Sequence, residues 1–301
     1  MATTIQPTAP RTPTLVVPRK HISNRMRFWR AFRRNRIALI GLIIVLLVAL
    51  SAIFADVLAP YNPIEPHYSE RLLPPNASFA LGTDELGRDL LSRLLYGARI
   101  SMVIGVVAEG VAITIGVTVG AIAGWYGGWI DDVIMRIADI FFAIPGLMFL
   151  IVWVTIFEPG PVSIFLALGL ISWPGDARMM RSQVLAIKEL DYVTAARSLG
   201  ASTSHMILRH VLPNAIAPMI VLASLGVAGV ILSESILSFL GLGIQIPTPS
   251  WGTMVDASRT YITTAWWYGV FPGLTIMLTV LGFNFLGDGL RDALQPTQYN
   301  K

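Results

Sequence analysis

Long apolar runs alternate with shorter polar segments along most of this chain. Six runs stand out, at residues 37–54, 100–125, 137–157, 161–173, 215–237 and 267–286. A helix needs about 20 apolar residues to cross the roughly 30 Å hydrocarbon core of a bilayer. Most of the runs approach or exceed that length, and the run at 161–173 is short. The pattern predicts an all-α polytopic membrane protein with six transmembrane helices.

Composition supports the membrane assignment. The chain is 54% hydrophobic and only 13% charged, whereas soluble domains average about a quarter charged residues. It contains no cysteine, which excludes disulfides and thiolate metal sites. The histidines are His21, His67, His205 and His210, and none lies in an apolar run. We therefore predict no metal site.

Basic residues set the expected orientation. A dense basic block precedes the first apolar run, made of Arg19, Lys20, Arg25, Arg27, Arg30, Arg33, Arg34 and Arg36. Cytoplasmic segments carry an excess of Lys and Arg, so this block predicts a cytoplasmic N-terminal tail at 1–36, disordered over 1–18. Nucleic-acid binding and lipid clamping are the less favoured interpretations of the block. With six spans, the other basic segments fall on the same side, including the C-terminal tail at 291–301. The transmembrane domain is then 37–290, with a first external loop at 55–99.

Two amphipathic segments are predicted outside the spans. In "GTDELGRDLLSRLLYGARIS", Thr83 or Asp84 is a candidate N-cap and Gly97 a candidate helix end. Leucines at helical spacing between them predict a helix lying on the outer membrane surface. After the fourth run, apolar residues recur intermittently from Met179 to Leu190 and predict a separate surface helix.

The segment 176–213 is the most unusual part of the pattern, because it is polar and rich in small residues between apolar runs. Within it, Asp191 is the expected N-cap of a short helix through Leu199, and Gly200 the expected left-handed stop. Ser202 is the expected cap of a second helix that ends at Leu212. Small side chains beside Gly200 allow another surface to approach closely. The segment is therefore either a projection that inserts into a cleft of a partner protein or an ordinary cytoplasmic connector.

This segment resembles the EAA motif of membrane subunits of ATP-binding-cassette importers. Thr194-Ala195-Ala196, Gly200 and Leu212-Pro213 match its spacing, whereas Thr194 replaces the usual glutamate and His210 a common isoleucine. The resemblance implies a coupling helix that sits in a groove of a partner ATPase. Its contact residues would be Thr194, Ala195, Ala196, Gly200 and Ala201, and the missing glutamate puts one possible ion pair in doubt.

The resemblance extends through "ISWPGDARMMRSQVL", "SILSFLGLGIQIPTPSWG" and "FPGLTIMLTVLGFNFLGDGLRDALQP". Together with the first-loop stretch, these look like the C-type permease subunit of dipeptide and oligopeptide importers. The resemblance implies a type I importer permease fold in a bacterial cytoplasmic membrane. It also implies a second homologous permease subunit, two ATPase subunits or domains, and an extracytoplasmic substrate-binding protein. Similar subunits serve importers of nickel, glutathione and antimicrobial peptides.

The positions of the lysines indicate that any ATPase must be a separate chain. The phosphate-binding loop of an ATPase has the pattern G-x-x-x-x-G-K-[ST]. The chain contains only Lys20, Lys188 and Lys301, and none of them follows a glycine. We therefore expect no cofactor and no enzymatic activity in this chain, with ATP and magnesium held by the partner ATPase subunits.

Two further sites are predicted. Glu109 lies near the middle of the second run, where a carboxylate facing lipid would cost about 2.5 kcal/mol or more. It should face either the substrate path or a buried neighbour, unless the span starts later and leaves Glu109 nearer the outer surface. The loop after the fifth run offers Pro247, Ser250, Trp251 and Asp256 as contacts for the binding protein.

Other functional classes fit less well. An ion-coupled secondary transporter would use membrane carboxylates, such as Glu109, Asp139 or Glu234, and usually an internal repeat. No repeated half is evident. An intramembrane hydrolase would need a catalytic Ser/His or paired-Asp arrangement inside the spans, and none is evident either.

Overall fold

The computed structural model describes residues 24–158 and 160–294, and over these residues the chain is almost entirely α-helical. No β-strand occurs in these two ranges. The predicted disordered tail at 1–18 and most of the C-terminal tail lie outside the described residues. The all-α prediction is confirmed for the part that the structure describes.

Four helical stretches are long and apolar enough to cross a membrane. They are α2 (Arg36–Ile53), α4 (Leu90–Tyr126), the stretch Thr203–Phe239, and α12 (Trp266–Leu294). A fifth is obtained if α5 (Gly128–Ala143) and α6 (Gly146–Phe157), which are bent by 88° relative to each other, count as one broken span. The break falls at Pro145, as expected for a residue without a backbone N–H. The count of six spans stays a prediction, because the helix that contains 161–173 is not among these stretches.

That helix, α7 (Pro161–Lys188), differs from the prediction of a short span followed by a separate surface helix. It is one continuous helix that passes through Pro174. Its partner α4 presents Gly116, Gly120 and Gly124 toward it, and a side chain at any of these positions would overlap α7. This close backbone packing holds α7 together beyond the proline, so the separate surface helix is wrong.

The predicted helix capped by Thr83 or Asp84 is also wrong. Asp84 instead closes a loop: its carboxylate accepts the backbone N–H groups of Leu86 and Arg88, each at 2.9 Å. The helix begins only at Leu90, capped by Asp89, which accepts the Ser92 N–H at 2.8 Å. It then runs through Gly97, the predicted end, to Tyr126 as part of α4.

The polar segment forms α8 (Asp191–Ser198) and α9 (Thr203–Met206), followed by a π-helical turn, η2 (Ile207–Val211). The predicted cap at Asp191 is wrong, because Leu190 occupies the cap position without a side-chain bond and Asp191 lies in the first turn. The predicted end at Leu212 is wrong as well. The wider turn of η2 leads directly into α10 (Leu212–Phe239) and places Pro213 in its first turn, where a missing N–H is tolerated.

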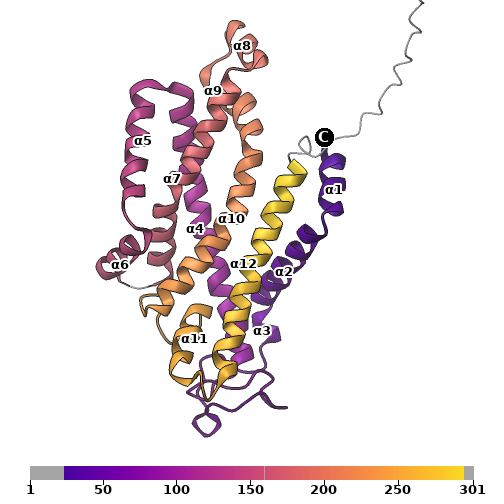
Figure 1. Ribbon diagram of the computed structural model, residues 1–301, viewed down its shortest axis with the longest axis vertical. Helices are drawn as coiled ribbons and strands as arrows, with labels where there is room; N and C mark the ends of the chain where they lie inside the picture. Colours follow the sequence, from indigo (N-terminus) through magenta and orange to yellow (C-terminus); the bar gives the residue numbers. More distant parts are fainter. Residues whose placement is uncertain (1–23, 159, 295–301) are drawn as a thin grey trace, which may run out of the picture.

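The helices form an elongated bundle (Figure 1). α4 packs along α7 and α10, while α12 packs against α2 and α10. α1 (Asn24–Arg34) lies beside the end of α12. The short elements α3 (Ala55–Leu58), η1 (Tyr68–Glu70), α11 (Trp251–Ser258) and η3 (Arg259–Tyr261) complete the list. The first loop and α11 gather at one end of the bundle, and α8 forms the tip of the other (Figure 1).

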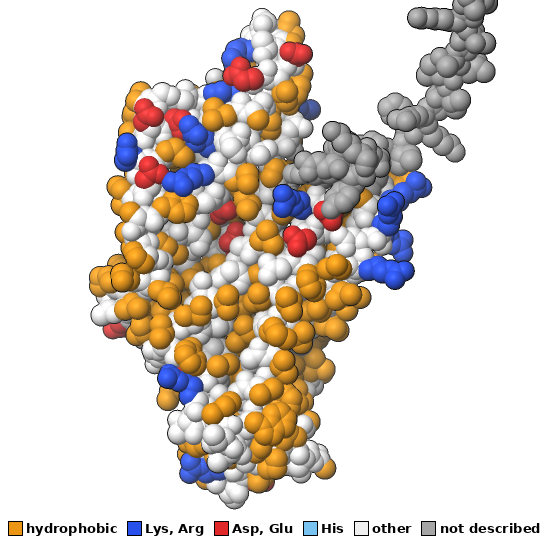
Figure 2. Space-filling view, viewed as in Figure 1, with side chains coloured by type: hydrophobic (Ala, Val, Ile, Leu, Met, Phe, Trp, Pro, Cys, Tyr) orange, Lys and Arg blue, Asp and Glu red, His pale blue; other side chains and the backbone are white. Residues whose placement is uncertain are grey.

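Hydrophobic and charged side chains are also distributed unevenly along the length of the bundle. Figure 2 shows a face that is mostly hydrophobic in its lower half, with Lys, Arg, Asp and Glu concentrated around the upper ends of the helices. Large apolar side chains such as Leu47 and Ile53 of α2 are 62% and 66% exposed. Exposed apolar side chains on this scale indicate contact with lipid or a protein partner.

Candidate functional site

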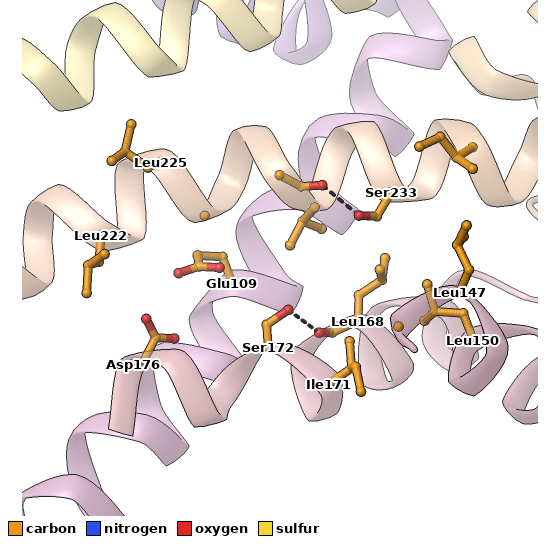
Figure 3. Close-up of a pocket in the computed structure, with 15 residues that line it drawn as sticks. Glu109, Leu147, Leu150, Leu168, Ile171, Ser172, Asp176, Leu222, Leu225 and Ser233 are labelled. Atoms are coloured by element: carbon orange, nitrogen blue, oxygen red, sulfur yellow. Dashed lines mark hydrogen bonds between the residues drawn. The ribbon is translucent and has the colours of Figure 1, made fainter. Parts of the chain in front are cut away.

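A cavity of about 410 Å³ lies between α4, α6, α7 and α10. Most of its lining is apolar, contributed by leucines of α6, α7 and α10. Its polar lining consists of Glu109, Ser172, Asp176 and Ser233. Figure 3 shows the side chains of Glu109 and Asp176 at the same end of this cavity. Pockets of a few hundred Å³ with few polar groups are typical small-molecule sites.

Glu109 projects from α4 toward α10, and its residue is only 4% exposed. Gly226 of α10 provides the space, because a Cβ at that position would overlap the Glu109 carboxyl group. Glu109 therefore lines the cavity rather than the lipid-facing surface. Whether substrate passes along it remains a prediction.

Asp176, on α7, is the acidic lining residue that the sequence analysis did not single out. It is 8% exposed and packs against Gly116 of α4, whose missing side chain lets the two backbones approach. The spacing of Gly116, Gly120 and Gly124 is the small-residue pattern of close helix pairs in membranes. That spacing could have identified the face of α4 that packs closely against another helix, but neither the partner α7 nor the direction of the Asp176 side chain.

The serines of the cavity are bonded to their own helices. The Ser172 hydroxyl donates to the Leu168 carbonyl at 2.8 Å, and the Ser233 hydroxyl donates to the Gly229 carbonyl at 2.9 Å. These bonds use the hydroxyl protons and leave the oxygen atoms free to accept. The polar part of the cavity is thus rich in hydrogen-bond acceptors.

The predicted coupling residues lie together at the tip of the molecule (Figure 1). Thr194, Ala195 and Gly200 are exposed, whereas Ala196 and Ala201 are half-buried. Gly200 adopts φ +80°, which confirms the predicted left-handed stop. The Gly200 N–H donates to the Arg197 carbonyl at 3.0 Å and the Ala201 N–H to the Ala196 carbonyl at 3.2 Å. This pair of bonds is the Schellman motif.

The base of this tip packs against the helix bundle, and its end is exposed. Val193 is fully buried in the cluster that joins α7 to α10. The Arg197 guanidinium lies over the Trp125 ring at 5.4 Å. The predicted cap at Ser202 is confirmed, since its side chain accepts the His205 N–H at 3.4 Å. By contrast, Leu199 is 90% exposed. The result is a projection that is anchored at Val193 and ends in an uncovered apolar side chain.

The four residues predicted to contact a binding protein differ in their exposure. Ser250 and Trp251 are fully buried, and the Trp251 indole donates to the Leu94 carbonyl at 3.1 Å. Pro247 is exposed, and Asp256 is half-exposed. Only Pro247 and Asp256 therefore offer surface to a partner of this chain, and their contact with a binding protein stays a prediction.

The end of the bundle opposite α8 (Figure 1) is organised by a buried charged cluster. The Asp84 carboxylate lies 2.6 Å from Arg88 Nε and 3.3 Å from Arg93 Nε. The neighbouring Glu85 accepts the Tyr268 hydroxyl of α12, and the Trp267 indole donates to the Thr83 carbonyl at 3.4 Å. These contacts fix the first loop on α12, next to α11.

Two family models match the sequence. One, described as a binding-protein-dependent transport system inner membrane component, matches residues 116–298. The other, described as the N-terminal TM domain of oligopeptide transport permease C, matches residues 23–75. The two matches together span most of the chain.

Several relatives are similar over nearly their whole length. The di/tripeptide transport system permease protein DppC of Pseudomonas aeruginosa (strain UCBPP-PA14) is 44% identical, covering 96% of both chains. The dipeptide transport system permease protein DppC of Escherichia coli (strain K12) is 48% identical, covering 89% of this chain and 92% of its own. The glutathione transport system permease protein GsiD of Shigella flexneri serotype 5b (strain 8401) is 44% identical, covering 89% of each.

One solved structure shares the fold. It is described as inward-facing conformations of the MetNI methionine ABC transporter, and the match has a TM-score of 0.55 at 19% identity. It covers 67% of this chain and 96% of the solved one. The predicted type I importer permease fold is therefore confirmed.

Proposed function

The chain belongs to the family of binding-protein-dependent transport system inner membrane components, and from this we propose that it is the C-type permease subunit of an ATP-driven importer of dipeptides and short oligopeptides. Relatives named as dipeptide permeases, 41–48% identical over most of the chain, support the substrate class. The substrate would pass through a path to which the cavity beside Glu109 contributes.

The observation that carries this proposal is the projection at α8. It is anchored by the buried Val193, ends in a Schellman turn at Gly200, and exposes Leu199 almost completely. An isolated projection of this kind gains nothing from exposing a leucine to water, since burying such a side chain stabilises by about 1.5–3 kcal/mol. A groove on an ATPase subunit is the partner that the family provides.

The remaining partners follow from the same assignment. A second, homologous permease subunit completes the transport path, and two ATPase subunits or domains bind and hydrolyse ATP with Mg²⁺. A binding protein delivers the substrate on the outer side, where Pro247 and Asp256 are accessible. Both termini lie in the cytoplasm, on the side of α8. Closure of the ATPase pair moves the coupling segment, and the cavity alternates between outward and inward access.

Glutathione is the second candidate substrate. The glutathione permease of Shigella flexneri is as similar in identity as the di/tripeptide permease of Pseudomonas aeruginosa, at 44% each. Glutathione is itself a tripeptide with a free amino group. Both substrates therefore carry a free amino group.

Uptake in sealed vesicles that contain the complete transporter tests the proposal. Radiolabelled Ala-Ala, presented on the binding protein, should accumulate only when ATP is supplied on the ATPase side. Collapsing the proton and sodium gradients should leave this uptake intact. Uptake that follows the ion gradients and ignores ATP would instead identify a secondary transporter.

A further inference from the structure

The cavity contains two acidic side chains that have no hydrogen-bond or ion-pair partner among residues 24–158 and 160–294. We propose that Glu109 and Asp176 together form a binding site for the primary ammonium group of a substrate in transit. This inference rests on the proposed function, and it assigns Asp176 a role that no sequence pattern indicated. The ligand class is a small molecule with a free primary amine, such as a peptide with an unmodified amino terminus.

Burial without partners is the first argument. Both residues are more than nine-tenths buried. Their carboxyl oxygens are open to the cavity (Figure 3), and no hydrogen bond or ion pair joins them to another described residue. A buried carboxylate that lacks a partner is costly, so such groups normally pair with a cation or a donor. The structure supplies neither group from this chain, and the cavity in front of them is where one would enter.

The basic side chains nearest in sequence are directed elsewhere. Arg178 follows Asp176 by two residues, but its guanidinium lies 2.5 Å from Asp139 of α5. Arg181 makes two contacts of 2.5 Å with Asp131, also on α5. The arginines of α7 thus bind α5 on the opposite side from the cavity. This arrangement leaves Glu109 and Asp176 available to a cation from outside the chain.

The packing of three helices directs the two carboxyl groups into one space. Asp176 lies at the level of Gly116, which follows Glu109 by seven residues, or about 10 Å along α4 at 1.5 Å per residue. The two residues therefore approach the site from successive levels of the bundle. Both side chains lie at the same end of the cavity (Figure 3). A group that enters from the proposed outer side would meet Glu109 first. A group that enters from the proposed inner side would meet Asp176 first.

A primary ammonium suits these acceptors better than a metal ion does. It carries three N–H donors and no acceptor, which matches two carboxylates together with the accepting oxygen atom of Ser172, one turn from Asp176 on α7 (Figure 3). Within the described residues, no group of three or more His, Cys, Asp or Glu side chains could hold a metal. The apolar remainder of the cavity, including Leu150, Leu168 and Leu222, suits the side chains of a short peptide.

Thiol labelling tests the site without a transport measurement. The chain has no native cysteine, so an introduced cysteine is its only thiol. Ser233→Cys places a single probe on the cavity wall. A positively charged methanethiosulfonate reagent should modify it faster than a negatively charged one. Asp176→Asn and Glu109→Gln should each reduce this preference, and the double variant should abolish it. Asp288→Asn is the matched control, since it removes the same charge from an exposed position of α12.

The same variants in the reconstituted transporter test the ammonium itself. With saturating loaded binding protein, Asp176→Asn should move about tenfold fewer Ala-Ala molecules per ATP hydrolysed, the size expected for losing a charge-assisted hydrogen bond. Asp176→Glu should restore much of this ratio, which a purely structural role would not predict. Unchanged reagent preference together with an unchanged ratio in Asp176→Asn would overturn the site. If the unmodified transporter moves no dipeptide with ATP, the proposed function fails, while the reagent preference still decides the site.

Discussion

Replacing Gly200 tests the coupling function at a single torsion angle. Gly200 has φ +80°, and a Cβ built on it would meet no atom within 4 Å. A substitution therefore creates no clash with neighbouring residues. Its effect is confined to the backbone of the turn that follows α8, where Leu199 is presented.

The magnitude follows from the conformation. A non-glycine L-residue loses about 1–2 kcal/mol in the left-handed region, and a difference of that size changes a population by a factor of about 5–30. Gly200→Ala should reduce ATP-dependent uptake by up to that factor. Valine should be worse because its branched side chain resists positive φ, and asparagine should be milder because it tolerates this region.

Gly241 provides a matched control at the other end of α10. It has φ +77°, and a Cβ there would also meet no atom within 4 Å. The Gly241 N–H donates to the Ser238 carbonyl and the Leu242 N–H to the Leu237 carbonyl, at 2.9 and 3.1 Å, which is again the Schellman pattern. Gly241→Ala therefore carries the same conformational cost, far from α8.

The assay is peptide uptake and binding-protein-stimulated ATP hydrolysis in proteoliposomes, normalised to inserted protein. Uptake should fall in the order glycine, asparagine, alanine, valine at position 200, and it should be retained in Gly241→Ala. Wild-type uptake by Gly200→Val would refute the coupling interpretation. An equal loss in Gly241→Ala would show that the loss reflects general destabilisation.

Three further outcomes are expected. Asp84→Ala removes the carboxylate that faces Arg88 and Arg93, which are 4% and 3% exposed, and should lower the free energy of unfolding by about 3–5 kcal/mol, measured by thermal unfolding in detergent. A cysteine at Thr203 should react with a membrane-impermeant reagent in inside-out vesicles and not in intact cells; labelling in intact cells would reverse the proposed topology. A photo-crosslinker at Asp256 should capture the binding protein, and its failure, with capture elsewhere on the outer face, would relocate the docking surface.

The parts of the fold that depend on local sequence were predictable. The apolar runs at 37–54 and 215–237 correspond closely to α2 and to α10, because length and hydropathy alone decide whether a segment suits a bilayer. The left-handed turn at Gly200 and the cap at Ser202 were predictable for the same reason, since both are determined by a few neighbouring residues.

Caps with several candidate residues could not be assigned from the sequence. Thr83, Asp84 and Asp89 are all suitable helix caps by residue type. Asp84 is not used as a cap because it accepts two backbone N–H groups of its own loop and faces two buried arginines. Gly97 likewise remains inside α4, where a Cβ would lie 3.0 Å from the Trp251 ring. The outcome at Gly97 depends on Trp251, which is distant in sequence and is not part of a local pattern. The outcome at Asp84 depends on the fold of its own loop, which residue type alone does not reveal.

The charged residues of α7 explain why hydropathy does not identify this helix as a span, and one of them lines the candidate site. Hydropathy measures how well a segment suits lipid, and α7 scores poorly because its second half contains Asp176, Arg178 and Arg181. The structure accounts for each of these charges within the protein: both arginines pair with α5, and the aspartate faces the cavity. A helix covered by α4 and α5 need not be apolar all round in order to cross a membrane. The charged residues that lower the hydropathy of α7 are therefore consistent with six spans. One of them, Asp176, is the carboxylate on the proposed path.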